Sequence, residues 1–216
     1  SNTDTEDNWR RKEGSFKTMY APDSFGYQHN SCGYRCDEFV ECSDSIKVLF
    51  VGCSITYGVG VPQEDTWAYQ TLAKLRQLLP DHHFPYWNLA KGGKSLDYAV
   101  RIVKNFTDHH KVDAVVMLMP DLHRAELCLH SDSLLEYLFN FPPGPGTHPA
   151  DVKAVQAWND HFAANDQFMQ YQLLKNLEFL QVLSEARQFL FRWSTWFRPY
   201  DMKAWVGAKQ IESMIL

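Results

Sequence analysis

The feature that most limits the possible folds is an alternation of short apolar stretches with amphipathic ones. Residues 46–51, 86–90 and 113–119 have the length and apolar composition of buried β-strands. Between them, residues 67–79 and 96–106 carry apolar side chains at the three- and four-residue steps of amphipathic helices. Strands that alternate with helices are joined by crossover connections, so they run parallel with helices on both faces of the sheet. The sequence therefore predicts an α/β fold: a flavodoxin-like, three-layer α/β/α arrangement with a mostly parallel sheet.

The chain of 216 residues is long enough for one domain with extensions. Residues 1–45 are polar and rich in turn-forming residues, which predicts an N-terminal arm and a turn-rich extension. Residues 46–216 are predicted to form the α/β domain. The periodic pattern loosens after Pro120, and residues 120–165 are interpreted as an insertion or lid. Within this insertion, residues 124–141 are predicted to be helical.

Periodicity returns after the insertion. Asn165 and Asp166 are typical helix-capping residues, and they precede a helical pattern that extends to about Ala186. Residues 188–193 have the composition of a strand, and residues 202–216 are predicted to form the last helix. These elements extend the predicted sheet and its helical layers.

Charge and composition exclude two classes of partner. The net charge of −5 offers no basic field for a phosphate backbone, so no nucleic-acid partner is expected. No apolar run approaches the roughly 18 residues that a membrane helix needs, so no membrane partner is expected either. Five cysteines are an odd number in a chain large enough to fold without disulfides. Reduced thiols are therefore expected, which favours a compartment such as the cytoplasm.

A small group of potential metal ligands lies in the N-terminal extension. His29, Cys32, Cys36 and Cys42 are close in sequence, and imidazole and thiolate groups at short spacing can hold zinc. The spacing lacks the paired Cys-x-x-Cys knuckles of a strong zinc motif. Cysteines in a turn-rich loop, without a metal, are the alternative interpretation.

Two glycine-containing turns follow the first two predicted strands. In an open α/β sheet, sites lie at the carboxyl ends of the strands, and Ser54 follows the first strand, two residues after Gly52. Ser54 can present its hydroxyl and its own N–H to a ligand; the alternative is a serine that only caps the following turn. In the second turn, Gly93 can offer a backbone N–H as an oxyanion donor. A phosphate-binding P-loop would need glycine at the position of Asn88, so that interpretation is excluded.

Taken together, these turns resemble a known family. The stretch LFVGCSITYGVGV resembles the first block of the SGNH hydrolases, or GDSL esterases, Gly-Asp-Ser-x-Thr-x-Gly-x-Gly, with Cys53 in place of the aspartate. NLAKGGKSLD resembles the second block and places Gly93 at the oxyanion glycine. NSCGYR, at residues 30–35, is similar to the Asn-x-x-Gly-[Phe/Tyr]-Arg stretch upstream of the nucleophile in one branch. The resemblance implies an ester hydrolase that forms an acyl-enzyme on Ser54.

The resemblance also implies which ligands to expect. It implies no metal and no organic cofactor. The expected partner is a small-molecule or glycan ester, and an O-acetylated carbohydrate ranks above a lipid ester.

The later blocks depart from the family pattern. Alignment on the third strand puts Asp121 where the family has an oxyanion asparagine, and an ionised carboxylate cannot donate a hydrogen bond. His123 and Arg124 are alternative donors, and His123 is also an alternative base; a solvated loop pair is the other interpretation. Family members carry Asp-x-x-His late in the domain, but no aspartate here precedes a histidine at that spacing, and the last histidine is His161.

We therefore expect the chain to stop where the Asp-x-x-His loop would begin. On this interpretation it is truncated and nearly inactive as it stands, because a serine needs a base within hydrogen-bond reach. The alternative is a non-catalytic binding or structural protein on the same fold.

Overall fold

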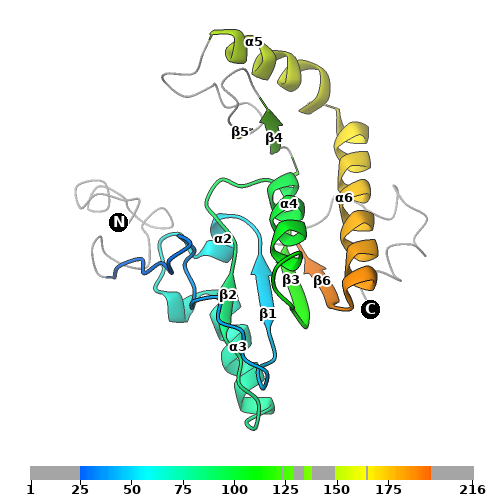
Figure 1. Cartoon of the computed structure of the whole chain (residues 1–216). Coiled ribbons are helices and arrows are strands. Elements are labelled where there is room, and N and C mark those ends of the chain that lie inside the picture. The colour runs from blue at the N-terminus through cyan, green and yellow to red at the C-terminus, as the bar shows by residue number, and fades with distance from the viewer. Residues whose placement is uncertain (1–24, 123, 129–133, 138–148, 164, 196–216) are drawn as a thin grey trace.

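The computed structural model describes residues 25–195 apart from 123, 129–133, 138–148 and 164. Its centre is a four-stranded sheet in the order β2-β1-β3-β6, and each neighbouring pair of strands is parallel. Figure 1 shows this sheet with helices packed against it. The strands are β1 (Val48–Val51), β2 (Tyr86–Asn88), β3 (Ala114–Leu118) and β6 (Leu190–Ser194). The predicted parallel sheet is confirmed.

Helices cover both faces of the sheet, because alternate residues of each strand point to opposite sides. On one face, Phe50 of β1 packs with Leu72 of α3 (Trp67–Leu78). On the other, Leu49 of β1 packs with Val103 of α4 (Leu96–Thr107) and Leu177 of α6 (Asp166–Arg187). The structure is thus mixed α/β with a parallel sheet between helices.

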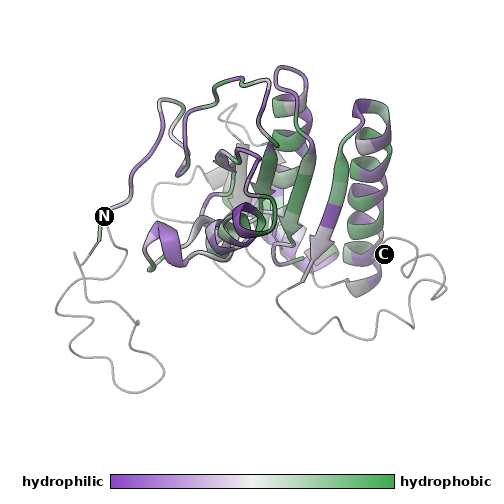
Figure 2. Ribbon diagram, turned by 90° about the horizontal axis from the view of Figure 1, so that it is seen from below, coloured by the Kyte–Doolittle hydropathy of each residue, from purple (hydrophilic) through white to green (hydrophobic). Residues whose placement is uncertain are grey.

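Hydropathy differs between the middle and the edge of the sheet. Figure 2 shows the middle strands almost entirely green, whereas β6 carries a purple segment. The charged residue of this LFRWS strand is Arg192, which is exposed. Charged side chains on an edge strand hinder its pairing with another chain.

Side-chain caps define where the helices begin. Thr66 accepts a hydrogen bond from the Tyr69 N–H, and Ser95 accepts one from the Tyr98 N–H. Asn165 caps α6 as predicted, although α6 begins at Asp166 and ends at Arg187, one residue beyond the predicted end. None of the helices in the described ranges is long and apolar enough to cross a bilayer.

The insertion is where the sequence-based prediction is wrong. Instead of a helix over residues 124–141, β4 (Ala125–Cys128) and β5 (Leu134–Tyr137) form an antiparallel pair. Alanine, leucine and glutamate favour helices, but this preference is weak and tertiary contacts override it. Here the Glu126 N–H donates to Asp97 of α4 and the Glu126 carboxylate binds Arg101, so contacts outside the segment hold β4 extended.

A further helix of the insertion was not predicted. It comprises α5 (Pro149–Trp158), which continues into a π-helix, η3 (Asn159–Ala163). Figure 1 shows β4 and α5 beyond the amino-terminal end of α4, at the end of the sheet toward which β1 runs. The predicted last helix, residues 202–216, lies outside the described residues.

Candidate functional site

The turn after β1 is built around a glycine that no other residue can replace. Gly52 has φ 154°, and an added Cβ would lie 2.3 Å from Thr56 Oγ1 and 2.7 Å from the Leu118 carbonyl oxygen. The chain then enters the short helix α2 (Ser54–Tyr57). Its first residue, Ser54, is half-exposed and lies at the carboxyl end of a central strand.

The cysteine before Ser54 is a buried packing residue. Cys53 is 2% exposed and is a free thiol. The Ser54 hydroxyl points back toward it, with Oγ 4.0 Å from Cys53 Sγ. Buried structural cysteines of this kind are inert, so Cys53 is not a candidate nucleophile, whereas Ser54 is half-exposed.

The second predicted turn emerges beside the first. β1 and β2 are parallel neighbours, so Ser54 and Gly93 follow strands that end at the same edge of the sheet. Asn88 links the two turns, because its Nδ2 donates to the Thr56 carbonyl oxygen at 2.8 Å. Gly93 has φ 77°, is exposed, and has no atom within 4 Å of an added Cβ. Glycine is therefore needed there for its backbone conformation, while the side facing outward stays open.

The third turn carries Asp121. It follows β3, which pairs with β1, so Asp121 also lies beyond the carboxyl edge, where it is half-exposed. The Arg124 N–H donates to the Asp121 carbonyl oxygen at 3.3 Å and closes this turn. His123, the predicted alternative base, lies outside the described residues.

Arg35 holds the loop that follows Ser54. Its guanidinium is buried, with the residue 1% exposed, and it donates to the carbonyl oxygens of Tyr57, Gly58 and Val61 at 3.1, 2.7 and 2.8 Å. The same group lies 4.4 Å from the ring centroid of Tyr27, a cation–π contact. Burial lowers the pKa of the Arg35 guanidinium. Arginine suits this position because its planar fork of donors satisfies several carbonyl groups at once.

The loop that carries Arg35 is itself ordered by its own side chains. Asn30 Oδ1 accepts hydrogen bonds from the N–H groups of Cys32 and Tyr34 at 3.1 and 3.0 Å, and Asn30 Nδ2 donates to the Asp37 carbonyl. Gly33 has φ 76°, a conformation that favours glycine. The sequence NSCGYR thus has a structural explanation that its pattern alone did not reveal: asparagine and glycine shape a turn that presents arginine to the loop after Ser54.

One histidine contacts α2, and it was not predicted to do so. His29 Nε2 lies 2.9 Å from the hydroxyl of Tyr57, three residues after Ser54. Burial raises the pKa of that tyrosine. By contrast, the His83 carbonyl accepts from the Ile46 N–H before β1, at the amino edge of the sheet. His29, which the sequence suggested only as a zinc ligand, is therefore the histidine to examine at this site.

The proposed zinc ligands do not converge. No group of three His, Cys, Asp or Glu side chains in the described ranges could hold a metal ion. Cys32 and Cys42 are exposed, whereas Cys36 is buried and receives a contact from Asn30 Nδ2 at 3.5 Å. Burial raises the pKa of the Cys36 thiol to about 12, which disfavours the thiolate that zinc requires.

An apolar hollow of about 510 Å³ lies at the same edge of the sheet, and its lining includes Ile55, the residue after Ser54. Its walls come from α2, α3, β3 and β6: Ile55, Trp67, Val116, Met117, Leu118, Arg192, Trp193 and Ser194. Trp193 is half-buried and packs against the main core cluster, as expected for a core residue near a strand end. An apolar hollow of this size can accommodate the non-polar part of a small ligand.

Comparison with known proteins adds no assignment. No family model matches the sequence, and no curated protein matches it. The likeness to SGNH hydrolases therefore depends on the three sequence blocks around Arg35, Ser54 and Gly93, and it stays a prediction.

Proposed function

We propose that this protein is a serine ester hydrolase of the SGNH type, with Ser54 as the nucleophile. The observation that carries the proposal is the position of Ser54: half-exposed, at the carboxyl end of the central strand β1, on a turn that requires glycine at position 52. Ligand sites of open α/β sheets occupy this edge. The anchoring of the next loop by Arg35 supports a rigid, preorganised turn.

In the proposed reaction, Ser54 Oγ attacks the carbonyl carbon of an ester and loses its proton to a base. The alcohol then leaves with a proton, and water hydrolyses the acyl-enzyme to release the acid and restore Ser54. Backbone N–H groups of Ser54 and Gly93 would stabilise the negative charge on the carbonyl oxygen. The exposed, unobstructed position of Gly93 beside the first turn favours this role. Asp121 contributes no donor while it is ionised.

The proposed substrate class depends mainly on the family resemblance. An O-acyl carbohydrate, especially an O-acetyl ester, is the proposed substrate from the family resemblance. The apolar hollow beside Ile55 supports a ligand with a non-polar portion, such as an acyl group. No metal or organic cofactor takes part in the proposed reaction.

The base determines how fast the reaction runs. The sequence contains no Asp-x-x-His, so the family's base and its orienting carboxylate are not encoded in these 216 residues. Oxyanion donors and binding alone retain roughly 10³- to 10⁴-fold acceleration over water. We therefore propose weak turnover, with His29 or His123 as the groups to test for a partial replacement.

The experiment is hydrolysis of p-nitrophenyl acetate by the 216-residue protein, by Ser54→Ala and by Ser43→Ala. Ser43 is an exposed surface serine whose hydroxyl donates a hydrogen bond to Asp44, so its replacement controls for the loss of a hydroxyl. We expect slow turnover above the buffer rate, abolished in Ser54→Ala and unchanged in Ser43→Ala. A fluorophosphonate should label the same serine, as mass spectrometry of the Ser54 peptide would show. Turnover that survives in Ser54→Ala would refute the proposal.

A second candidate function is a non-catalytic binding or structural protein. The missing Asp-x-x-His favours it, since a serine without a base is a weak nucleophile. In that case neither turnover nor labelling of Ser54 would be detectable, although the protein would be folded by circular dichroism. The two candidates are thus separated by one set of measurements.

A further inference from the structure

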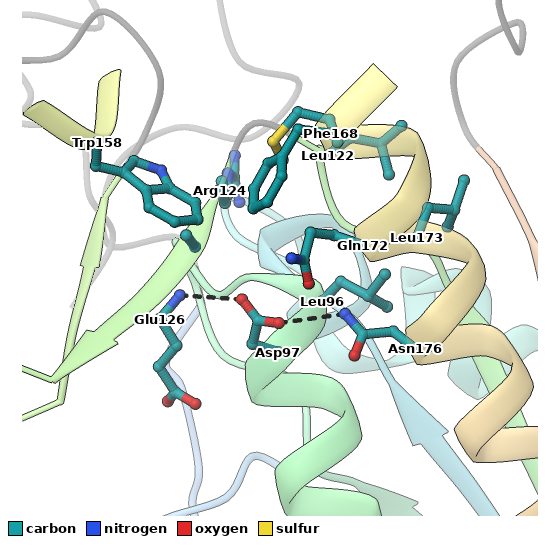
Figure 3. Close-up of a pocket in the computed structure, with 12 residues that line it drawn as sticks. Leu96, Asp97, Leu122, Arg124, Glu126, Trp158, Phe168, Gln172, Leu173 and Asn176 are labelled. Atoms are coloured by element: carbon teal, nitrogen blue, oxygen red, sulfur yellow. Dashed lines mark hydrogen bonds between the residues drawn. The ribbon is translucent and has the colours of Figure 1, made fainter. Parts of the chain in front are cut away.

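A second hollow, of about 200 Å³, lies between the body of the protein and the insertion. Figure 3 shows that its lining comes from the start of α4, from β4 and the turn before it, from the end of α5 and from the first turns of α6. Leu96 and Asp97 of α4 follow the Gly93 turn in sequence, so the hollow adjoins the carboxyl edge of the sheet. It lies apart from the apolar hollow beside Ile55, with which it shares no lining residue.

The carboxylates of this pocket are already occupied. Asp97 Oδ2 accepts from the Glu126 N–H and Asp97 Oδ1 accepts from Asn176 Nδ2, both at 3.2 Å, as the dashed lines in Figure 3 show. The Glu126 carboxylate pairs with both Nε and Nη2 of Arg101. These acidic groups therefore hold α4, β4 and α6 together: Arg101 pairs with the Glu126 carboxylate, and both Asp97 oxygens accept from uncharged N–H donors.

Two donors of the pocket are not satisfied. Arg124 Nε and Trp158 Nε1 are buried, and neither has a hydrogen-bond partner in the part of the chain that the structure describes. Arg124 makes one long bond, from Nη1 to the Lys94 carbonyl oxygen at 3.4 Å, and it has no ion pair among the residues that the structure describes. Buried donors are rarely left without acceptors in folded proteins, so each such atom calls for an explanation.

The remaining walls are apolar. Trp158 and Phe168 meet edge to face, with ring centroids 5.6 Å apart, and Leu96, Leu122 and Leu173 complete the lining. Figure 3 shows Trp158, Arg124 and Phe168 side by side at one end of the pocket. An apolar enclosure with a few converging polar groups is typical of a small-molecule site.

We propose that this pocket binds a small organic carboxylate with an apolar body. The carboxylate would accept hydrogen bonds from the guanidinium of Arg124 and the indole N–H of Trp158, while the body lies against the aromatic and leucine side chains. A cationic ligand would be repelled by Arg124 and would find, among the described lining residues, no carboxylate that is not already bonded to protein donors. A neutral sugar would bring hydroxyl donors to acceptors that protein groups already occupy. The site uses no atom of Ser54 and is independent of the proposed hydrolase activity.

The experiment is a titration of the ¹⁵N-labelled 216-residue protein with benzoate, followed by NMR of the tryptophan indole N–H signals. Trp158→Phe identifies the Trp158 signal by its loss. Benzamide, which has the same shape without the charge, and methyl glucoside, a neutral sugar, are titrated in parallel. The variants are Arg124→Gln and, as a matched control, Arg76→Gln, since Arg76 lies on the distant α3 and donates a hydrogen bond to the Phe84 carbonyl.

We expect saturable binding of benzoate with a shift of the Trp158 indole signal, and much weaker binding of benzamide and the sugar. Arg124→Gln should weaken benzoate binding by about 10- to 100-fold, as expected for a hydrogen bond to a charged group. Arg76→Gln and Ser54→Ala should bind benzoate as the wild type does. The proposal is wrong if benzoate does not saturate the Trp158 signal, if benzamide or the sugar binds as tightly, or if folded Arg124→Gln retains full affinity. Loss of binding in Ser54→Ala would also overturn it, because the ligand would then lie at Ser54.

Discussion

Two regions meet the carboxyl edge of the sheet, and they are attached to it in different ways. The loop after Ser54 is anchored from below by the buried Arg35, whose donors reach three carbonyl groups of that loop. The insertion is tied to α4 and α6 through half-buried polar groups, mainly Asp97, Arg101 and Glu126. The first region is held by a buried cation, and the second by an ion pair in which the Arg101 side chain is 39% exposed and the Glu126 side chain 7% exposed. Rigidity at this edge is therefore expected to be highest where Ser54 lies.

The largest expected effect comes from the buried cation. Arg35→Met removes the donors to Tyr57, Gly58 and Val61 and leaves their carbonyl groups without those partners. Each buried acceptor left unsatisfied costs about 1–3 kcal/mol, so we expect a loss of about 3–5 kcal/mol in the free energy of unfolding. Urea denaturation followed by circular dichroism measures it. Arg76→Met, which loses a single bond, should lose far less, and an equal loss in the two variants would contradict the comparison.

The glycine of the Ser54 turn gives the next largest effect. Gly52→Ala places Cβ against Thr56 Oγ1 and the Leu118 carbonyl, and the carbonyl belongs to a central strand that cannot move freely. We expect a loss of about 2–4 kcal/mol in the free energy of unfolding, by thermal or urea denaturation. Gly26→Ala is the matched control, because an added Cβ there meets no atom within 4 Å. A neutral Gly52→Ala would mean that the turn is less constrained than the geometry indicates.

Weakening the attachment of the insertion should affect the protein near β4 and leave the central sheet unchanged. Asp97→Ala removes the acceptor of the Glu126 N–H and of the Asn176 amide, and we expect a loss of about 1–2 kcal/mol. Amide hydrogen exchange should accelerate at Glu126 and remain unchanged at Val51 of β1. Asp81→Ala, at an exposed surface position, serves as the control. Equal acceleration at β1 and β4 would show that the two regions open together.

The smallest effect depends on pH and concerns the segment that carries Arg35. Burial raises the pKa of Cys36 to about 12 in the folded protein, above the usual value of about 8.5 for a free thiol. The unfolded chain therefore loses the thiol proton first, so stability falls as pH rises from about 8.5 toward 12. At one pH unit above the unfolded pKa, this contribution is about 1.4 kcal/mol.

The measurement for Cys36 compares urea denaturation of the wild type and Cys36→Ala at pH 8 and at pH 10. The variant should show a smaller loss of stability between the two pH values, since it lacks the thiol. Exposed Cys32 and Cys42 should react with iodoacetamide well before Cys36 in the folded protein. Rapid modification of Cys36 would indicate that the segment opens readily.

Much of the fold follows from local pattern. Apolar runs and three- to four-residue periodicity predicted β1, α3, β2, α4, β3, α6 and β6 with ends close to those of the structure. The pattern at residues 124–141 failed, because its leucines, alanine and glutamates suit a helix as well as a strand. What decided between them was the bonding of Glu126 to Asp97 and Arg101, which lie 29 and 25 residues away.

The same distinction between local pattern and long-range contacts applies to the candidate site. The order of strands and turns along the chain already places Ser54 and Gly93 after successive strands, because this feature depends on local pattern. The need for glycine at position 52 also depends on the fold, since an added Cβ would meet the Leu118 carbonyl of β3. Only the tertiary structure decided that Arg35 binds carbonyl groups 22–26 residues away, that His29 contacts Tyr57, and that Arg124 and Trp158 line one pocket. Periodicity records which face of an element is buried. It does not record which distant group fills that face, because that depends on how the elements pack in three dimensions.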